Sequence, residues 1–180
     1  MEFDKDLQSI QEVRNLVAKA KAAQAEFATF SQERVDAVVK AIAQACEKEA
    51  ERLAKMAVEE TGFGIWQDKV LKNLLGSKMT YEHIKDMKTI GVLREIPERG
   101  LTEIGVPMGV VAALIPSTNP TSTVMYKSLI SLKAGNAIVI SPHPRAKKCT
   151  IAAAKVVLEA AVKAGAPEGL IGWIDIPNLE

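Results

Sequence analysis

Apolar residues recur at spacings of three and four along the first half of the chain, the pattern of one face of an α-helix. The first such stripe consists of Leu7, Ile10, Val13 and Val17. A second helix is predicted to begin after Ser31, a suitable N-cap, and to run unbroken to Thr61, where Gly62 and Gly64 supply a stop. A third helix is expected over Asp68–Tyr81. The first half is therefore predicted to be helical.

Beyond residue 90 the period of the pattern changes. Apolar and polar residues alternate from Ile90 to Val106 around a central Pro97–Gly100, which predicts a β-hairpin. From Gly109 short apolar segments alternate with helical ones. The predicted order is strand Val110–Ile115, helix Thr121–Ala134, strand Ala137–Ile140, helix Arg145–Ala164 and strand Leu170–Ile174. Wholly apolar strands between helices are typical of a parallel sheet, so the expected fold class is α/β, with N-terminal helices and the first part of a doubly wound, Rossmann-like sheet.

The turn after the first apolar strand is the most informative segment. It contains Ile115, Pro116, Ser117, Thr118, Asn119 and Pro120. In an open parallel sheet, ligands bind outside the carboxyl ends of the strands, beside the unpaired N–H groups of the next helix. Asn119 is then a polar amide held between two prolines at a binding cleft. The local sequence equally favours the alternative that Asn119 is only the N-cap of the following helix.

A second candidate segment follows the next predicted strand, at the same edge of the sheet. It consists of Ser141, Pro142 and His143. Taken alone, it favours a structural role, in which the prolines end the strand and start the helix with His143 in solvent. Two such turns from neighbouring strands flank one crevice, which shifts the balance toward a ligand site. The fingerprint G-x-G-x-x-G is absent from the first turn, so a nucleotide has to bind differently.

The composition is that of a globular protein, with 48% hydrophobic and 25% charged residues and a formal net charge of +1. Nucleic-acid binding is not expected, because this charge gives no strong positive field and aromatic residues for base stacking amount to 4%. No apolar run approaches the length of a membrane span, and the N-terminus has no signal-peptide pattern. Neither membrane association nor secretion is expected, and the cytoplasm is the predicted location.

The two cysteines, Cys46 and Cys149, lie far apart and outside any cysteine or histidine cluster, which argues against a disulfide framework and a metal site. Cys46 lies on the apolar face of the predicted long helix. A cysteine at a helix N-terminus can be activated, but the last predicted helix is expected to begin near Arg145, at least one turn before Cys149. Both cysteines are therefore expected to be packing residues.

Three segments together resemble the CoA-acylating aldehyde dehydrogenases, which include acetaldehyde dehydrogenase and the N-terminal half of bifunctional aldehyde/alcohol dehydrogenases. They are IPSTNPTST at 115–123, KSLISLKAGN at 127–136 and SPHPRAK at 141–147, with ETGFGIWQDK at 60–69 as further support. The resemblance implies that an aldehyde, CoA and NAD are interconverted with acyl-CoA and NADH. It assigns Asn119 the role of donating its amide to the oxygen of the thioester or hemithioacetal. NAD is expected at the turns Ile115–Pro120 and Ser141–His143.

The resemblance also divides the chain into three parts. Residues 1–88 are expected to be the helical part of the nucleotide-binding domain, residues 89–106 a hairpin that joins an oligomerisation sheet, and residues 107–180 the βαβαβ part. Ordinary aldehyde dehydrogenases carry a lysine near the position of Ser141 and a glutamate near that of Pro144. Both are missing here, a departure that resembles the acylating branch.

In this family the catalytic cysteine lies downstream in a second domain, and neither Cys46 nor Cys149 matches it. The chain is therefore expected to lack the catalytic domain, to be inactive alone and to form a homo-oligomer only in a full-length enzyme. That enzyme is expected in the cytoplasm, either free or inside a bacterial microcompartment. The alternative is a standalone nucleotide-binding or assembly module without catalysis.

Overall fold

The computed structural model describes residues 4–177, and its first half is helical, as the apolar periodicity predicts. The helices before the sheets are α1 (Lys5–Phe27), α2 (Gln32–Lys48), α3 (Ala50–Thr61), α4 (Trp66–Leu74) and α5 (Thr80–Ile84). Ser31 caps α2 as expected, because its side chain accepts a hydrogen bond from the N–H of Arg34. Within residues 4–177 no helix is long and apolar enough to cross a membrane.

The second half forms two separate sheets. The first is an antiparallel pair of β1 (Gly91–Ile96) and β2 (Leu101–Gly105). The second is parallel and has the strand order β3 (Val110–Ile115), β4 (Ala137–Pro142) and β5 (Ile171–Trp173). Its two crossovers contain α6 (Pro120–Lys133) and α7 (Lys147–Lys163). The alternation of parallel strands and helices confirms the predicted α/β class.

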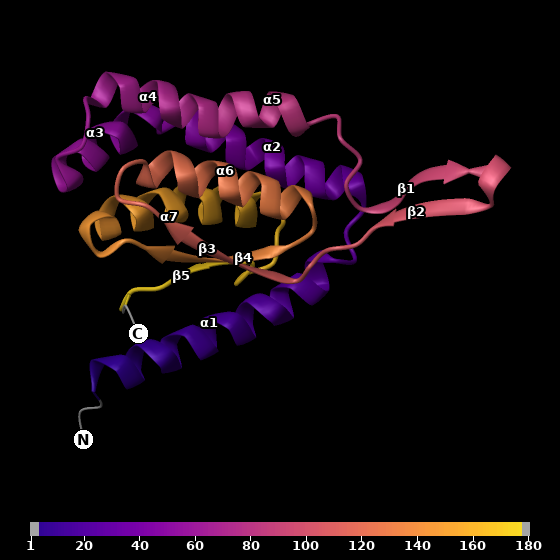
Figure 1. Ribbon diagram of the computed structural model, residues 1–180, viewed down its shortest axis with the longest axis horizontal. Helices are drawn as coiled ribbons and strands as arrows, with labels where there is room; N and C mark the ends of the chain where they lie inside the picture. The colour runs from indigo at the N-terminus through magenta and orange to yellow at the C-terminus, as the bar shows by residue number, and fades with distance from the viewer. Residues whose placement is uncertain (1–3, 178–180) are drawn as a thin grey trace.

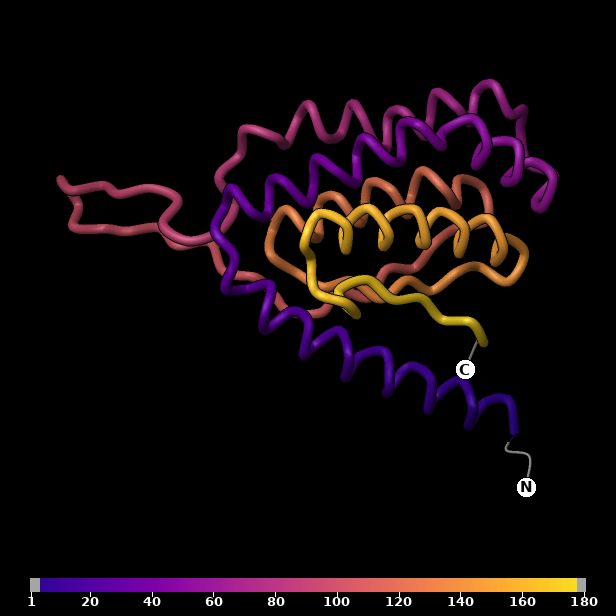
Figure 2. The backbone as a smooth tube through the Cα atoms, turned by 180° about the vertical axis from the view of Figure 1, so that it is seen from behind, coloured from indigo at the N-terminus to yellow at the C-terminus, as the bar shows by residue number. Residues whose placement is uncertain are grey.

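The parallel sheet lies between two helical layers (Figure 1). α1 crosses one face of the sheet and contacts all three strands, while α6 and α7 cover the other face. α2 packs on α6 and α7 from outside, as the view from behind also shows (Figure 2). Ala137 to Ile140 of the central strand are all buried, because both faces of β4 are covered. The core therefore lies on both faces of β4 and includes buried residues of α1, α2, α6 and α7.

The prediction of one unbroken helix from Ser31 to Thr61 is wrong in one respect, because the helix is broken at Glu49, between α2 and α3. The side chain of Asn73, from α4, donates a hydrogen bond to the carbonyl of Ala50 at this junction (2.8 Å). A polar side chain that inserts beside a helix bend is a common cause of such breaks. The partner comes from a residue 23 positions away, so no local pattern reveals it.

The helix predicted over Asp68–Tyr81 is interrupted by a π-helical turn, Leu75–Met79, between α4 and α5. Gly76 lies in this turn, where a Cβ atom would come within 2.6 Å of the carbonyl oxygen of Ser122. The backbone of the π turn therefore packs directly on the first turn of α6, which only a glycine permits. Single π turns inside α-helices occur frequently at functional sites.

α1 is helical as predicted, but the stripe of Leu7, Ile10 and Val17 does not face the sheet, since these side chains are 51%, 45% and 39% exposed. The buried residues of α1 are Ser9, Ala20, Ala23 and Phe27. Small side chains let α1 lie close to the sheet, and its N-terminal half is held by polar contacts: the carboxylate of Glu12 accepts the N–H groups of Asp175 and Ile176. The periodicity thus revealed the helix but not its buried face.

The hairpin is present, as the sequence predicts, and it projects from the body and touches little of the rest of the chain (Figures 1 and 2). Every residue of β1 and β2 is exposed except the terminal Ile96 and Gly105, which are partly buried, and Ile104 is 60% exposed. A bidentate ion pair between Arg94 and Glu103 crosses the two strands. Two-stranded sheets with exposed apolar residues are ready to pair with further strands.

Candidate functional site

The two predicted turns lie side by side at one edge of the parallel sheet. In the β3–β4 register, Leu114 is opposite Ser141 and Ile115 is opposite Pro142, so both strands end at the same level. This edge is open: the side chain of Leu114 is 74% exposed. The turn from β3 to α6 and the turn from β4 to α7 therefore form one surface at the carboxyl ends of the strands, where α/β proteins bind ligands.

Two lysines of α4 hold the β3–α6 turn. Lys69, only 4% exposed, donates from its ammonium to the backbone carbonyl of Thr118 (2.6 Å). Lys72, one helical turn further, donates to the Oδ1 atom of Asn119 (3.0 Å). Burial lowers the pKa of Lys69, and the nearby charge of Lys72 adds to this shift. α4 thus fixes both the backbone and the side chain of the turn.

The side chain of Asn119 makes no hydrogen bond to the end of the helix that it precedes. Asn119 occupies the N-cap position of α6, but its side chain accepts no capping hydrogen bond. The carbonyl of Asn119 accepts the first intrahelical hydrogen bond, from the N–H of Thr123 (3.2 Å), and also accepts from the hydroxyl of Thr123 (2.6 Å). The side-chain amide is therefore not consumed by the helix end.

A buried polar network connects α4 to the first turn of α6. The Oδ1 atom of Asn73 accepts from the hydroxyl of Thr121 (2.7 Å), and the amide nitrogen of Asn73 holds Ala50 of α3. Asn73 is 1% exposed and Thr121 is 2% exposed, so these bonds form out of contact with water. Together with the close approach at Gly76, they fix the distance between α4 and α6.

A hollow of about 450 Å³ lies beside Asn119, between the π turn and the start of α6. It is lined by Lys72, Leu75, Gly76, Thr80, Asn119, Ser122, Thr123 and Tyr126. Its wall combines one cation, neutral hydroxyl and amide groups, and the apolar surfaces of Leu75 and Tyr126. Such a hollow can admit a small, weakly polar molecule and place it against the amide of Asn119.

The β4–α7 turn is closed by the protein itself. His143 accepts a hydrogen bond at Nδ1 from the N–H of Arg145 (3.1 Å), which caps a short 3-10 turn over Pro144–Ala146. The carboxylate of Glu60, from α3, then accepts the N–H groups of Lys148 (2.8 Å) and Cys149 (2.7 Å). An internal carboxylate therefore occupies the anion-binding end of α7. The structural alternative placed His143 in solvent, whereas the residue is partly buried and its ring caps the 3-10 turn.

The expectation for Cys149 needs one correction. α7 begins at Lys147 after the 3-10 turn, so Cys149 lies in its first turn rather than a turn inside it. The thiol is nevertheless inert: it is buried, and burial together with the carboxylate of Glu60 raises its pKa to about 12. Burial also raises the pKa of Cys46 to about 12. Neither thiol has the properties of a nucleophile.

The residues predicted to contact NAD differ in what they present to a ligand. Ile115, Pro120 and Pro142 are buried and offer only their backbone. Pro116 and Thr118 are exposed, and the partly buried residues are Ser117, Asn119, Ser141 and His143. The accessible groups are thus mostly neutral hydroxyls and amides on a fixed backbone, which fit the ribose and amide parts of a nucleotide better than its diphosphate.

Sequence reasoning did not assign a role to Lys69, Lys72 or Asn73, although Glu60 and Lys69 lie in a segment that supported the resemblance. The signal that could have found the lysines is their spacing of three on a helix otherwise rich in apolar residues. The partner turn lies 47 to 49 residues away, so the contact itself depends on the tertiary fold. Among residues 4–177, no group of three histidine, cysteine or acidic side chains is placed to hold a metal ion.

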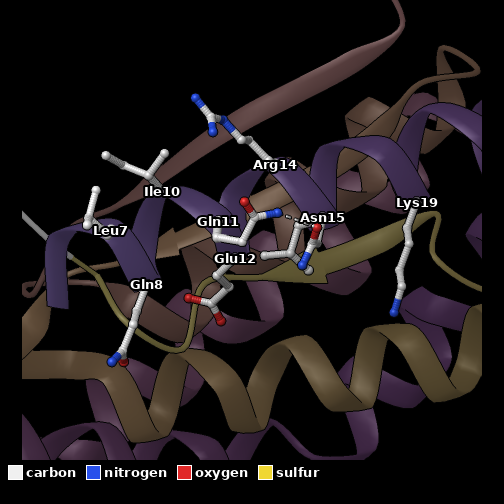
Figure 3. Close-up of a pocket in the computed structure, with 9 residues that line it drawn as sticks. Leu7, Gln8, Ile10, Gln11, Glu12, Arg14, Asn15 and Lys19 are labelled. Carbon is white, nitrogen blue, oxygen red and sulfur yellow. Dashed lines mark hydrogen bonds between the residues drawn. The ribbon is translucent and has the colours of Figure 1, made fainter. Parts of the chain in front are cut away.

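A larger depression runs along α1, but it is a weaker candidate. Figure 3 shows that it is lined by one helix, with Leu7, Ile10 and Arg14 on one side and Glu12 and Lys19 on the other. The side chains of Gln11 and Asn15 bond to each other (2.9 Å), and the carboxylate of Glu12 already binds backbone N–H groups. The polar groups drawn there are therefore largely satisfied within the helix and its neighbour.

Residues 6–175 match the model of the aldehyde dehydrogenase family. The bifunctional aldehyde-alcohol dehydrogenase of Escherichia coli is 51% identical over 172 residues, which cover 96% of this chain and 19% of that protein. A crystal structure of an acetylating aldehyde dehydrogenase from Geobacillus thermoglucosidasius is 54% identical, with a TM-score of 0.97 over 99% of this chain and 39% of that one.

A structure of propionaldehyde dehydrogenase from Rhodopseudomonas palustris, with bound CoA and an acylated cysteine, is 31% identical with a TM-score of 0.79. The match covers 92% of this chain and 38% of that one. The chain thus spans about two fifths of the matched crystal structures and about one fifth of the bifunctional relative.

Proposed function

The chain belongs to the aldehyde dehydrogenase family, and from this premise we propose that the protein containing it is a CoA-acylating, NAD-dependent aldehyde dehydrogenase. The substrate class is a short aldehyde, with acetaldehyde the first candidate. The printed names of the relatives support the acylating reaction, since one is acetylating and another was seen with bound CoA and an acylated cysteine. The departures at Ser141 and Pro144 from ordinary aldehyde dehydrogenases point the same way.

The proposed reaction has two chemical steps. A cysteine thiolate would add to the aldehyde carbon to give the hemithioacetal alkoxide, which would become a thioester on loss of hydride, and bound NAD⁺ would supply the hydride acceptor. The thiol of CoA then attacks the thioester and releases the cysteine with the acyl group on CoA. Cys46 and Cys149 are both buried with raised pKa values, so we assign the nucleophile to a cysteine outside these 180 residues.

The role of this chain in both steps is to stabilise negative charge on the carbonyl oxygen. That oxygen becomes an oxyanion when the thiolate adds and again when CoA attacks. The side-chain amide of Asn119 supports the assignment, because it is held at the open edge of the sheet and is not used as a helix cap. A neutral donor fixed before reaction needs no reorganisation when charge develops, and this is the source of its effect.

NAD is proposed to lie along the carboxyl edge of β3 and β4. We assign its contacts to the backbone from Ile115 to Pro120 and to the hydroxyls of Thr118, which is exposed, and of Ser117 and Ser141, which are partly buried. Glu60 occupies the N–H groups at the start of α7, so the diphosphate is not assigned to that helix end. When bound, NAD⁺ supplies the hydride acceptor, and these residues supply orientation.

The hollow beside Asn119 is proposed to receive the aldehyde side chain. The hollow fits this role because the amide of Asn119 forms part of its polar wall, while Leu75 and Tyr126 supply apolar surface.

The projecting hairpin is proposed to pair with another subunit. It fits this role because apolar residues of its strands, Ile104 among them, are exposed.

The observation that carries the proposal is the free, fixed amide of Asn119 at the end of β3. The test is an assay of the complete protein that contains these residues, with NAD⁺, acetaldehyde or another short aldehyde, and with CoA present or omitted. NADH formation that requires CoA and yields acyl-CoA supports the proposal. Oxidation of the aldehyde to the free acid at the same rate without CoA would contradict the acylating assignment.

A further inference from the structure

We propose that Lys72 is a positioning residue, which orients the amide of Asn119 so that its N–H groups, and not its oxygen, face the reacting carbonyl. This inference rests on the proposed function, because it concerns the donor that function requires. A carboxamide has two ends of opposite hydrogen-bonding character, and a half-turn about its last bond exchanges them. An Asn119 turned the wrong way would present its oxygen to a developing negative charge and repel it.

The contact with Lys72 selects one of the two orientations of the Asn119 amide. A lysine ammonium has only donors, so the amide atom within 3.0 Å of its Nζ has to be the oxygen. With the oxygen held by Lys72, the NH2 group points away from α4. Because the side chain of Asn119 makes no capping bond to α6, no competing contact with the helix end fixes it in the opposite orientation.

The lysine is itself held in register by its surroundings. Lys69 is buried and bonded to the carbonyl of Thr118, the residue directly before Asn119. Asn73, next to Lys72, is bonded to both α3 and Thr121. Buried contacts on either side of Lys72 therefore join this part of α4 to the turn, and Lys72 and Asn119 line the same hollow.

The charge of Lys72 adds a second effect in the same direction. A cation at the amide oxygen draws electron density away from the nitrogen, which makes its N–H groups stronger donors. Lys72 is exposed in this structure, so water screens this contribution and orientation is the larger effect. Arginine could supply the same donor, whereas methionine has a similar length and supplies none.

The test is a set of variants of the complete protein, assayed for CoA-dependent NADH formation. Lys72→Met is expected to lower kcat about 10-fold, less than the 10²–10³-fold loss from deleting an oxyanion donor, with the KM for NAD⁺ unchanged. Lys72→Arg is expected to retain most of the rate. Lys78→Met is the matched control, because Lys78 is an exposed lysine of the same helical segment that binds Glu47 instead.

The decisive comparison is the double variant with Asn119→Ala. If Lys72 acts through Asn119, then Lys72→Met costs nothing further once Asn119 has been replaced. An equal loss in both backgrounds would overturn the inference, as would a loss of thermal stability without a loss of kcat. If Asn119→Ala lowers kcat and Lys72→Met does not, this inference fails alone; if Asn119→Ala leaves kcat unchanged, the oxyanion assignment fails and this inference falls with it.

Discussion

The β3–α6 and β4–α7 turns occupy equivalent places in the fold, yet their polar side chains are used differently. At the β4–α7 turn, His143 caps a 3-10 turn and Glu60 takes the first N–H groups of α7. At the β3–α6 turn, the amide of Asn119 is excluded from the cap and held by Lys72. The two turns therefore share a position at the carboxyl edge of the sheet but differ in the side-chain network around them, and the proposed function rests on this difference.

The largest expected effect separates the chemical roles of the two turns. Asn119→Ala in the complete protein should lower kcat about 10²–10³-fold, because an oxyanion donor acts where charge develops. His143→Ala should lower it only a few-fold, since its ring nitrogen caps a turn. Steady-state kinetics of both variants with saturating NAD⁺ measure the difference. Equal losses at the two positions would remove the distinction between the turns.

A second prediction concerns the packing that positions the β3–α6 turn. Gly76→Ala places a Cβ atom within 2.6 Å of the carbonyl oxygen of Ser122. Either the π turn or α6 has to move, and the expected loss is about 1–3 kcal/mol of the free energy of unfolding. Chemical denaturation monitored by circular dichroism measures it, with Leu75→Ala, an exposed neighbour, as the control. Unchanged stability would show that α4 and α6 are not tightly fitted.

The third prediction concerns the carboxylate that closes the β4–α7 turn. Glu60→Ala should lower the free energy of unfolding by about 1–2 kcal/mol, because two N–H groups at the start of α7 lose their acceptor. The neighbouring Glu59→Ala, at an exposed position, should change it much less. Thermal unfolding of the two variants side by side gives the comparison. A larger loss for Glu59 would contradict the capping role of Glu60.

The smallest effect is expected at the cysteines. With pKa values raised to about 12, both thiols stay protonated up to that pH, so only roughly one in ten thousand is a thiolate at pH 8. Iodoacetamide should therefore label Cys46 and Cys149 only after denaturation. Glu60→Ala should increase labelling of Cys149 but not of Cys46, since Glu60 raises the pKa of Cys149 alone. Rapid labelling of either thiol in the native protein, measured by mass spectrometry, would contradict this account.

The sequence was sufficient for the order of the strands and helices and for bringing the two candidate turns to one edge of the sheet. Apolar strands such as Val110–Ile115 alternate with helices that carry local stop signals, and the structure confirms the α/β class and the hairpin around Pro97–Gly100. The shared edge of the two turns follows from parallel strands alone. These features depend on periodicity and local turn chemistry, which are readable along the chain.

What the sequence did not reveal depends on contacts between distant residues. The break at Glu49 and the π turn at Gly76 both involve contacts with side chains or backbone more than 20 residues away. The sequence does not distinguish the two possible roles of Asn119, because an asparagine at an N-cap position is the same in sequence whether or not its side chain caps the helix. The contact with Lys72, 47 residues earlier, is a property of the folded structure.

The most direct test of the central claim is a crystal structure of the complete protein with acyl-CoA bound. The account predicts that the amide nitrogen of Asn119 lies about 2.7–3.1 Å from the thioester carbonyl oxygen, while its Oδ1 atom remains on the ammonium of Lys72. A carbonyl oxygen held instead by the β4–α7 turn, with the amide of Asn119 turned onto the N–H groups of α6, would contradict it.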